Sequence, residues 1–277
     1  MDDVVALILA RGLGRRMREE GPADVRLSSA QESAARAGLK GLMPIGAGEV
    51  PGRPFLDYVL GALADAGLGE IALIVAPDHD AIRAQYSGPA LPSRFTLHYV
   101  VQREPLGTAD AVLAAESHVS GRPFIVLNAD NLYPVETLRA MRTLGGPGLP
   151  GFERDELVRS SDIPADRVAA FALLSVAPDG TLLDIVEKPG AAAMEAAGPH
   201  ALISMNCWRF DQRIFGACRA VPRSARGEFE LPEAVRLAVR QGVRFRVVPA
   251  RGPVFDLSRR ADVPVVAERL ARRPVSL

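Results

Sequence analysis

The sequence has few of the side chains that build disulfide scaffolds or zinc sites. Only two cysteines occur among its 277 residues, Cys207 and Cys218, with no CxxC spacing, and the four histidines are scattered. A disulfide framework is therefore excluded, and no zinc pattern is visible. Both cysteines are expected to be reduced and structural.

An excess of charge of either sign is also missing, as are long apolar runs. Lys+Arg and Asp+Glu both number 33, so the formal net charge is zero and nothing global indicates nucleic acid or an anionic membrane as a partner. No stretch reaches 18 apolar residues, and the first apolar run follows acidic residues, unlike a signal peptide. We expect a cytoplasmic protein in which any anion site is local.

Lysine itself is nearly absent. It occurs only at Lys40 and Lys188, so 33 − 2 = 31 of the cationic side chains are arginines. A compact ammonium is a point charge that a planar guanidinium does not replace. These two positions are therefore candidates for a functional role, with chance as the alternative.

Strands and helices alternate through the first half of the chain. VVALILA (4–10) reads as a buried parallel strand, and a helix between Pro54 and Gly67 leads to the strand EIALIVAP. The order repeats through PFIVLNAD (123–130) and the helix VETLRAMRTL. This predicts a Rossmann-like α/β fold, with an open, mostly parallel sheet covered by helices on both faces.

The second half carries mixed signals. The turn formers GGPGLPGFE (145–153) are expected to break the alternation. Strands over 167–176 and 181–188, joined at Pro178-Asp-Gly180, predict a hairpin, and GEFELPEAVRLAVRQG predicts a helix. Residues 1–277 are therefore expected to form one domain whose second half adds a small mixed-sheet elaboration.

The segment between the first loop and Lys40 is polar. Within it, Ser29 and Glu32 have the spacing of a capping box, and Gly38 is a plausible helix stop. A short helix is therefore expected directly before Lys40.

The loop after the first strand has the composition of an anion site. Gly12 and Gly14 allow backbone N–H groups to approach phosphates, and Arg15 and Arg16 add charge. A dinucleotide fingerprint would need a glycine where Met17 stands, and a Walker loop would need Gly-Lys-Ser/Thr. On these residues alone, a plain tight turn is an equal alternative.

Other polar residues stand where chemistry could occur. Asp130 ends a buried strand and Asp256 ends a short apolar run, so the two carboxylates could share a Mg²⁺ ion, although helix capping is the alternative. The amide of Gln102 could pair with a base edge beside Gly107, and Arg226 could clamp a phosphate. The simpler alternatives are that Gln102 is an ordinary loop residue, that Gly107 only starts a helix and that Arg226 forms a surface ion pair.

Taken in order, these segments resemble the sugar-1-phosphate nucleotidyltransferases, which include glucose-1-phosphate thymidylyl-, uridylyl- and adenylyltransferases. The loop RGLGRRM is similar to the family's GGxGTRL, and KGLMPI to its KxLLPV. LGTADAV, LNADNLY and IVEKP follow in family order, SARGEFELPEAV is similar to SARGELEITD, and VFD resembles the segment with the second aspartate. The resemblance runs from about residue 4 to about 265.

The resemblance implies magnesium-dependent transfer of a nucleotidyl group from a nucleoside triphosphate to a sugar 1-phosphate, with pyrophosphate as the leaving group. Residues 1–144 would form the nucleotide-binding half and 145–277 the sugar-phosphate-binding half. The implied roles are catalysis for Arg16, Lys40 and Asp130; nucleotide binding for Ala10, Gly12, Gly14, Gln102, Gly107 and Thr108; sugar-phosphate binding for Glu187, Lys188, Asn206 and Arg226; and Mg²⁺ binding for Asp130 and Asp256.

The chain departs from the family pattern at a few positions. Arg11 replaces the first glycine of the loop and Arg15 its threonine, and MNCWRF lacks the glycine usual after the sugar-site asparagine. The alternative hypothesis is therefore a catalytically inactive, nucleotide-sensing homologue. An NAD-dependent dehydrogenase is disfavoured by Met17. The base, the sugar and the oligomeric state, a homo-oligomer included, stay open.

Overall fold

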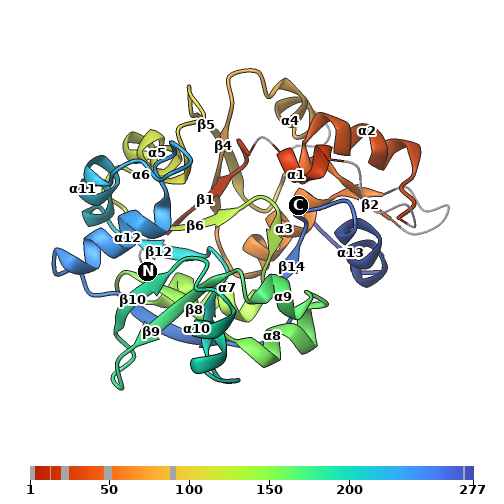
Figure 1. The fold of residues 1–277 in the computed structure, drawn as a ribbon. Coiled ribbons are helices and arrows are strands. Elements are labelled where there is room, and N and C mark those ends of the chain that lie inside the picture. Colours follow the sequence, from red (N-terminus) through yellow and green to blue (C-terminus); the bar gives the residue numbers. More distant parts are fainter. Residues whose placement is uncertain (1–3, 13, 20–24, 47–51, 88–91, 271) are drawn as a thin grey trace.

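The protein is built around one large mixed sheet (Figure 1). The computed structural model describes residues 4–12, 14–19, 25–46, 52–87, 92–270 and 272–277. The sheet has ten strands in the order β10-β9-β11-β8-β12-β6-β1-β4-β5, with β13 paired to β8 off this path. Its strands are β1 (Val5–Leu9), β4 (Glu70–Val75), β5 (Thr96–Val101), β6 (Phe124–Asn128), β8 (Gly148–Glu153), β9 (Ala172–Val176), β10 (Leu182–Val186), β11 (Leu202–Ser204), β12 (Trp208–Phe210) and β13 (Arg246–Ala250).

The first half of the chain forms the parallel part of this sheet. β1 lies between β4 and β6, with Leu7 opposite both Ala72 and Val126, and β4 also pairs in parallel with β5. Successive side chains of β1 point to opposite faces, so Val5 and Leu7 enter one buried core and Ala6 and Ile8 the other. A strand buried on both faces must be apolar throughout, which explains the unbroken run VVALILA.

Helices cover both faces, as the alternating pattern predicts. The core that contains Leu7 is closed by α5 (Thr108–Ala114), α6 (Glu116–Val119), α11 (Arg213–Ala220) and α12 (Leu231–Arg240), which gather on one side in Figure 1. The opposite core is closed by α3 (Phe55–Asp65), α7 (Val135–Thr143) and α13 (Asp262–Leu270). The α/β fold class with a helix layer on each face is confirmed. The predicted mostly parallel sheet with a separate small elaboration is corrected to one large mixed sheet, because the strands of the second half join the same sheet mainly through antiparallel pairs.

Shorter elements connect and decorate these layers. They are the helices α1 (Arg15–Arg18), α2 (Ser29–Ala37), the 3-10 turn η1 (Lys40–Leu42), α4 (Asp80–Gln85), α8 (Arg154–Ser161), α9 (Ala165–Val168) and α10 (Ala191–Ala196), and the strand pairs β2 (Pro44–Ile45) with β3 (Arg53–Pro54) and β7 (Asn131–Leu132) with β14 (Phe255–Asp256). Among the described residues, every helix is too short or too polar to cross a lipid bilayer.

The segment 145–153 is where the sequence prediction was wrong. Instead of a break it holds β8, which pairs with β11, β12 and β13. A Cβ at Gly148 would lie 2.4 Å from the backbone oxygen of Arg246, and one at Gly151 would lie 2.8 Å from Val247 Cγ1. These glycines allow close strand packing and do not form turns. The second half therefore continues the central sheet, mostly through antiparallel pairs.

The predicted hairpin and the predicted helix before Lys40 are both present in the structure. The hairpin is confirmed, because β9 and β10 pair antiparallel and Gly180 turns with φ 83°. Its first strand begins at Ala172 and not at the predicted residue 167, which lies in α9. The helix before Lys40 also exists, but its capping box begins one residue earlier than expected. Ser28 Oγ accepts from Gln31 N, and Gln31 Oε1 accepts from Ser28 N at 3.0 Å. Gly38 ends this helix with φ 73°, as predicted.

Candidate functional site

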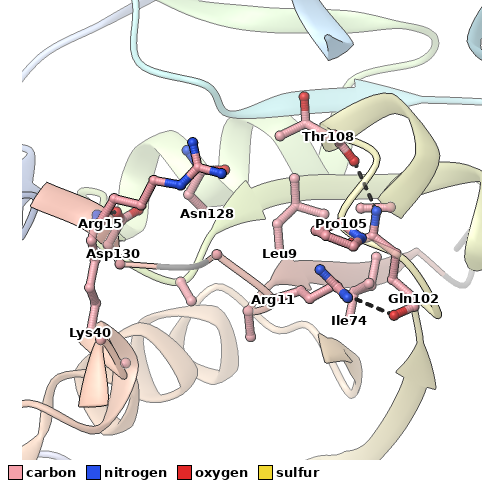
Figure 2. A pocket seen from close by; sticks show the side chains of 18 of the residues that line it. Leu9, Arg11, Arg15, Lys40, Ile74, Gln102, Pro105, Thr108, Asn128 and Asp130 are labelled. Carbon is pink, nitrogen blue, oxygen red and sulfur yellow. Dashed lines mark hydrogen bonds and ion pairs between the residues drawn. The ribbon is translucent and has the colours of Figure 1, made fainter. Parts of the chain in front are cut away.

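A cavity of about 460 Å³ opens at the carboxyl ends of the parallel strands. Leu9, Ile74 and Asn128, from the ends of β1, β4 and β6, border it (Figure 2). Ligands of open α/β sheets bind at this edge. Of the residues predicted from the sequence, the cavity is lined by Ala10, Gly12, Gly14, Arg16, Lys40, Gln102, Gly107, Thr108, Asp130 and Arg226.

One end of the cavity is cationic. Gly14 adopts φ 59°, and a Cβ there would lie 2.3 Å from the backbone oxygen of Gly38, so only glycine lets the loop pack against the end of α2. This packing brings Arg15 and Arg16, both exposed, to the same cavity as Lys40. Figure 2 draws Arg15 on the side of Lys40 and Asp130.

Lys40 forms an ion pair with Asp130 at this end. Lys40 Nζ donates a hydrogen bond to Asp130 Oδ2 at 2.7 Å, and about a fifth of each side chain is exposed. Burial alone would lower the pKa of Lys40, but the charge of Asp130 and its hydrogen bond outweigh burial and raise this pKa. Lys40 is therefore held fully charged.

Asp256 is buried beside this pair. β14 pairs with β7 so that Asp256 is opposite Asn131, and the next amide, Leu257 N, donates to Asp130 O at 2.8 Å. Burial first, and then the negative charge of Asp130, raise the pKa of Asp256 to about 6. The two carboxylates are therefore close enough to repel each other, although Asp256 is not among the residues that line the cavity.

Sequence reasoning missed the partners of Asp256. Arg167, from α9, forms ion pairs with both Asp256 and Asp262, and Ser258 Oγ donates to Asp256 Oδ1 at 2.7 Å. Arg167 is 89 residues away in the sequence, so no local pattern could have identified it. The guanidinium of Arg167 offsets part of the cost of burying the negative charge of Asp256.

The other end of the cavity contains Gln102. This side chain is 4% exposed, and its Nε2 donates to Gly107 O at 3.0 Å and to Asp110 Oδ2 at 2.7 Å. Both amide hydrogens are therefore used, and Gln102 Oε1 can only accept a hydrogen bond. Gly107 adopts φ 117°, where a Cβ would lie 2.4 Å from Phe229 O.

Arg11, the unusual residue of the loop, extends toward Gln102. Its Nε donates to Gln102 O at 2.9 Å and its Nη2 to Arg103 O at 3.2 Å, and Figure 2 shows the contact with Gln102. The guanidinium thus links the loop after β1 to the loop after β5. Arg11 was one reason for the alternative hypothesis of an inactive homologue, and in the structure its guanidinium contacts backbone carbonyls of the opposite loop.

Of the four predicted sugar-phosphate residues, only Arg226 lines the cavity. Arg226 reaches the cavity and forms a bidentate ion pair with Glu230, at 2.6 and 2.7 Å. The pKa of Glu187 is raised by desolvation and then by the charge of Glu230, which shows that Glu187 lies near this pair. Lys188 and Asn206 do not line the cavity, but both adopt positive φ, at 47° and 60°. Such backbone strain is common at ligand sites. The ligand roles of all four remain predictions.

Sequence comparisons relate this chain to known nucleotidyltransferases. A nucleotidyl transferase family model matches residues 36–252. A UTP–glucose-1-phosphate uridylyltransferase of Haloferax volcanii is 25% identical over 227 residues, which are 82% of this chain and 88% of that protein. A glucose-1-phosphate thymidylyltransferase of Streptomyces antibioticus is 27% identical over 259 residues, 93% of this chain and 64% of that protein.

Solved structures give the same result for the fold. The chain superposes on a UDP-glucose pyrophosphorylase complexed with UDP-glucose with a TM-score of 0.74 and 17% identity, covering 98% of this chain and 99% of the other. A UDP-glucose pyrophosphorylase from Acinetobacter baumannii matches with a TM-score of 0.72. The family model spans most of the chain, and the predicted resemblance is confirmed: the chain belongs to the nucleotidyl transferase family.

Proposed function

We propose that this protein transfers a nucleotidyl group from a nucleoside triphosphate to a sugar 1-phosphate and releases pyrophosphate. The observation that carries the proposal is the division of one cavity into two chemically different ends. Arg15, Arg16 and Lys40 line one end. At the other end the amide side chain of Gln102 is buried, and the guanidinium of Arg11 is engaged by backbone carbonyls. A triphosphate and its base require this pairing of environments.

The proposed reaction is an in-line displacement at the α-phosphorus. An oxygen of the sugar 1-phosphate forms a new P–O bond while the bond to the pyrophosphate oxygen breaks. A phosphate monoester dianion is already nucleophilic, so no side chain needs to remove a proton. Lys40 and Arg16 would stabilise the charge that builds on the phosphoryl oxygens, and positioning supplies much of the remaining rate enhancement.

Asp130 and Asp256 are the proposed magnesium ligands. The donor set fits, because two neighbouring carboxylates supply the oxygen ligands that Mg²⁺ prefers. Burial first, and then repulsion by Asp130, raise the pKa of Asp256. A divalent cation between them would relieve this repulsion. When bound, it would neutralise charge on the phosphates. The Lys40 and Arg167 ion pairs hold the two carboxylates in orientation.

The proposed substrates follow from the same residues and from the relatives. Because Gln102 Oε1 only accepts, it suits a base edge with an N–H donor, such as N3–H of uracil or thymine, and does not suit N3 of cytosine. The relatives named above are uridylyl- and thymidylyltransferases that act on glucose 1-phosphate, which supports a uridine or thymidine triphosphate and glucose 1-phosphate as the substrates. We propose that residues 1–144 hold the nucleotide and that 145–277, through Arg226, hold the sugar phosphate.

A matrix of triphosphates against sugar 1-phosphates tests the proposal. Pyrophosphate release with Mg²⁺ present is expected to be fastest with UTP or dTTP and glucose 1-phosphate, and slow with CTP. Asp130→Asn, measured on the same matrix, is the control for contaminating activity. If the wild-type chain binds nucleotide but turns over no pair, the enzyme proposal fails and the nucleotide-sensing alternative takes its place.

A further inference from the structure

Two histidines and a glutamate meet at the end of the sheet opposite the cavity. Glu70 begins β4, His98 lies in β5 and His118 lies in α6. In the parallel pairing His98 is opposite Ala72, so Glu70 and His98 project from the same face, which α6 covers. From Glu70 to Ile74, which borders the cavity, β4 rises roughly 13 Å. The cluster is therefore separate from the candidate active site.

The three side chains are spaced like ligands of one ion. Each offers a ligand atom, and these atoms all lie within 4.8 Å of one another. Glu70 Oε1 lies 3.3 Å from His118 Nε2 and 3.9 Å from His98 Nε2. A tetrahedral ion with bonds of about 2.0–2.2 Å separates its ligand atoms by roughly 3.3–3.6 Å. Small side-chain movements would therefore suffice to bind an ion.

His118 adds an independent observation. Its Nε2 is buried and has no hydrogen-bond partner within the described part of the chain, and its approach to Glu70 Oε1 lacks hydrogen-bond geometry. Buried polar atoms normally have a partner, and a metal ion would supply one. A metal ligand must also be deprotonated, and burial first, and then the nearby His98, lower the pKa of His118.

Arg122 orients the carboxylate of Glu70, and its positive charge would repel a bound cation. Its Nη1 donates to Glu70 Oε2 at 2.7 Å and its Nη2 to Glu70 Oε1 at 3.0 Å, while the same guanidinium donates to His118 O at 3.1 Å. Orienting a ligand carboxylate is a common role of the residues around a metal site. The positive charge also repels a cation, so the expected affinity is moderate.

We infer that Glu70, His98 and His118 form a binding site for a zinc-class divalent ion, with water completing the coordination. Two imidazole nitrogens and one carboxylate suit Zn²⁺ or Co²⁺ and not Mg²⁺. The bound ion would join α6 to β4 and β5, and so act on stability and not on nucleotidyl transfer. The spacing of 28 and 20 residues between the ligands explains why no zinc motif is visible in the sequence.

The test is a zinc titration of the full chain after treatment with a chelator and its removal, with excess Mg²⁺ to occupy the active-site carboxylates. Calorimetry with ZnCl₂ is expected to give one site per chain. His98→Gln and His118→Gln should each weaken binding at least tenfold. His200→Gln is the matched control, because His200 also contacts a glutamate, Glu153 at 3.1 Å, but belongs to no three-ligand group among the described residues. This variant should bind Zn²⁺ like the wild type.

Two further readouts keep the outcome decisive. Co²⁺ should give the visible absorption of a four-coordinate site in the wild type and lose it in both histidine variants. Zn²⁺ should raise the melting temperature of the wild type and the control only. His98 is the more exposed histidine, at 41% of its side chain, so its replacement tests the site even if His118→Gln does not fold. Absence of saturable Zn²⁺ binding, or equal affinity in the double variant His98→Gln/His118→Gln, would overturn the inference.

Discussion

Replacing Asp256 by asparagine should stabilise the metal-free protein at neutral pH. Asp256 is 8% exposed, and burial together with Asp130 raises its pKa from 3.8 to about 6. A raised pKa means that the folded state binds the proton more tightly than the unfolded state. Its favourable contribution is complete below pH 3.8 and is lost as the pH rises through about 6. A shift of roughly two units corresponds to about 3 kcal/mol.

The asparagine side chain has no charge to bury, so this loss should disappear in Asp256→Asn. The raised pKa already includes the opposing effects of the ion pair with Arg167 and the hydrogen bond from Ser258. The expected gain at pH 7.5 is therefore up to about 3 kcal/mol. Arg167 keeps its second partner, Asp262. The same variant should lose Mg²⁺-dependent turnover, because one proposed ligand is gone.

Urea unfolding in EDTA, repeated from pH 4.5 to 7.5, measures this effect. The difference in unfolding free energy should grow in favour of Asp256→Asn across this range and shrink when Mg²⁺ is added, since only the wild type binds it well. Asp262→Asn is the control, because Asp262 also pairs with Arg167 and accepts from Ser258 N and Arg259 N. It should destabilise the protein. A difference between Asp256→Asn and wild type that does not change with pH would refute the reasoning.

Four other substitutions, at three positions, test the cavity. Lys40→Ala should lower kcat roughly a hundredfold or more, which is the scale of losing one electrostatic stabiliser. Lys40→Arg should not restore the rate. Near-normal steady-state rates in either variant would mean that the role of Lys40 is misassigned. Arg11→Gly should raise KM for the triphosphate several-fold with little change in kcat, because only the brace on residues 102–103 is lost; an unchanged KM would contradict that role. Gly107→Ala should lower the melting temperature, because its Cβ would lie 2.4 Å from Phe229 O, and a melting temperature equal to wild type would show that this segment can move aside.

Many of the candidate site residues could be identified before the fold was known. Lys40, Asp130 and Gln102 each lie in a short segment that the family motifs mark, and the order of these segments matches the family. Because parallel strands end at the same edge of a sheet, the spacing alone predicts that residues after β1, β5 and β6 meet there. The structure brings Lys40 within 2.7 Å of Asp130 across 90 residues of sequence.

Other features depend on contacts between segments that have no common local pattern. The glycines and prolines of 145–153 have low strand propensity, yet three neighbouring strands impose the extended conformation of β8. The ion pair between Arg167 and Asp256 and the cluster of Glu70, His98 and His118 likewise join residues that are far apart in sequence. Composition only indicated that histidines are few.

The sequence by itself determined the family, the alternation of strands and helices in the first half of the chain, and many of the residues that line the cavity. Apolar periodicity and short motifs record these properties locally, within one strand and its loop. The tertiary structure alone decided that Arg11 reaches Gln102 and that Asp256 is paired with Arg167. Side-chain direction and charge pairing are set by the packing of distant segments, which no single stretch of sequence records.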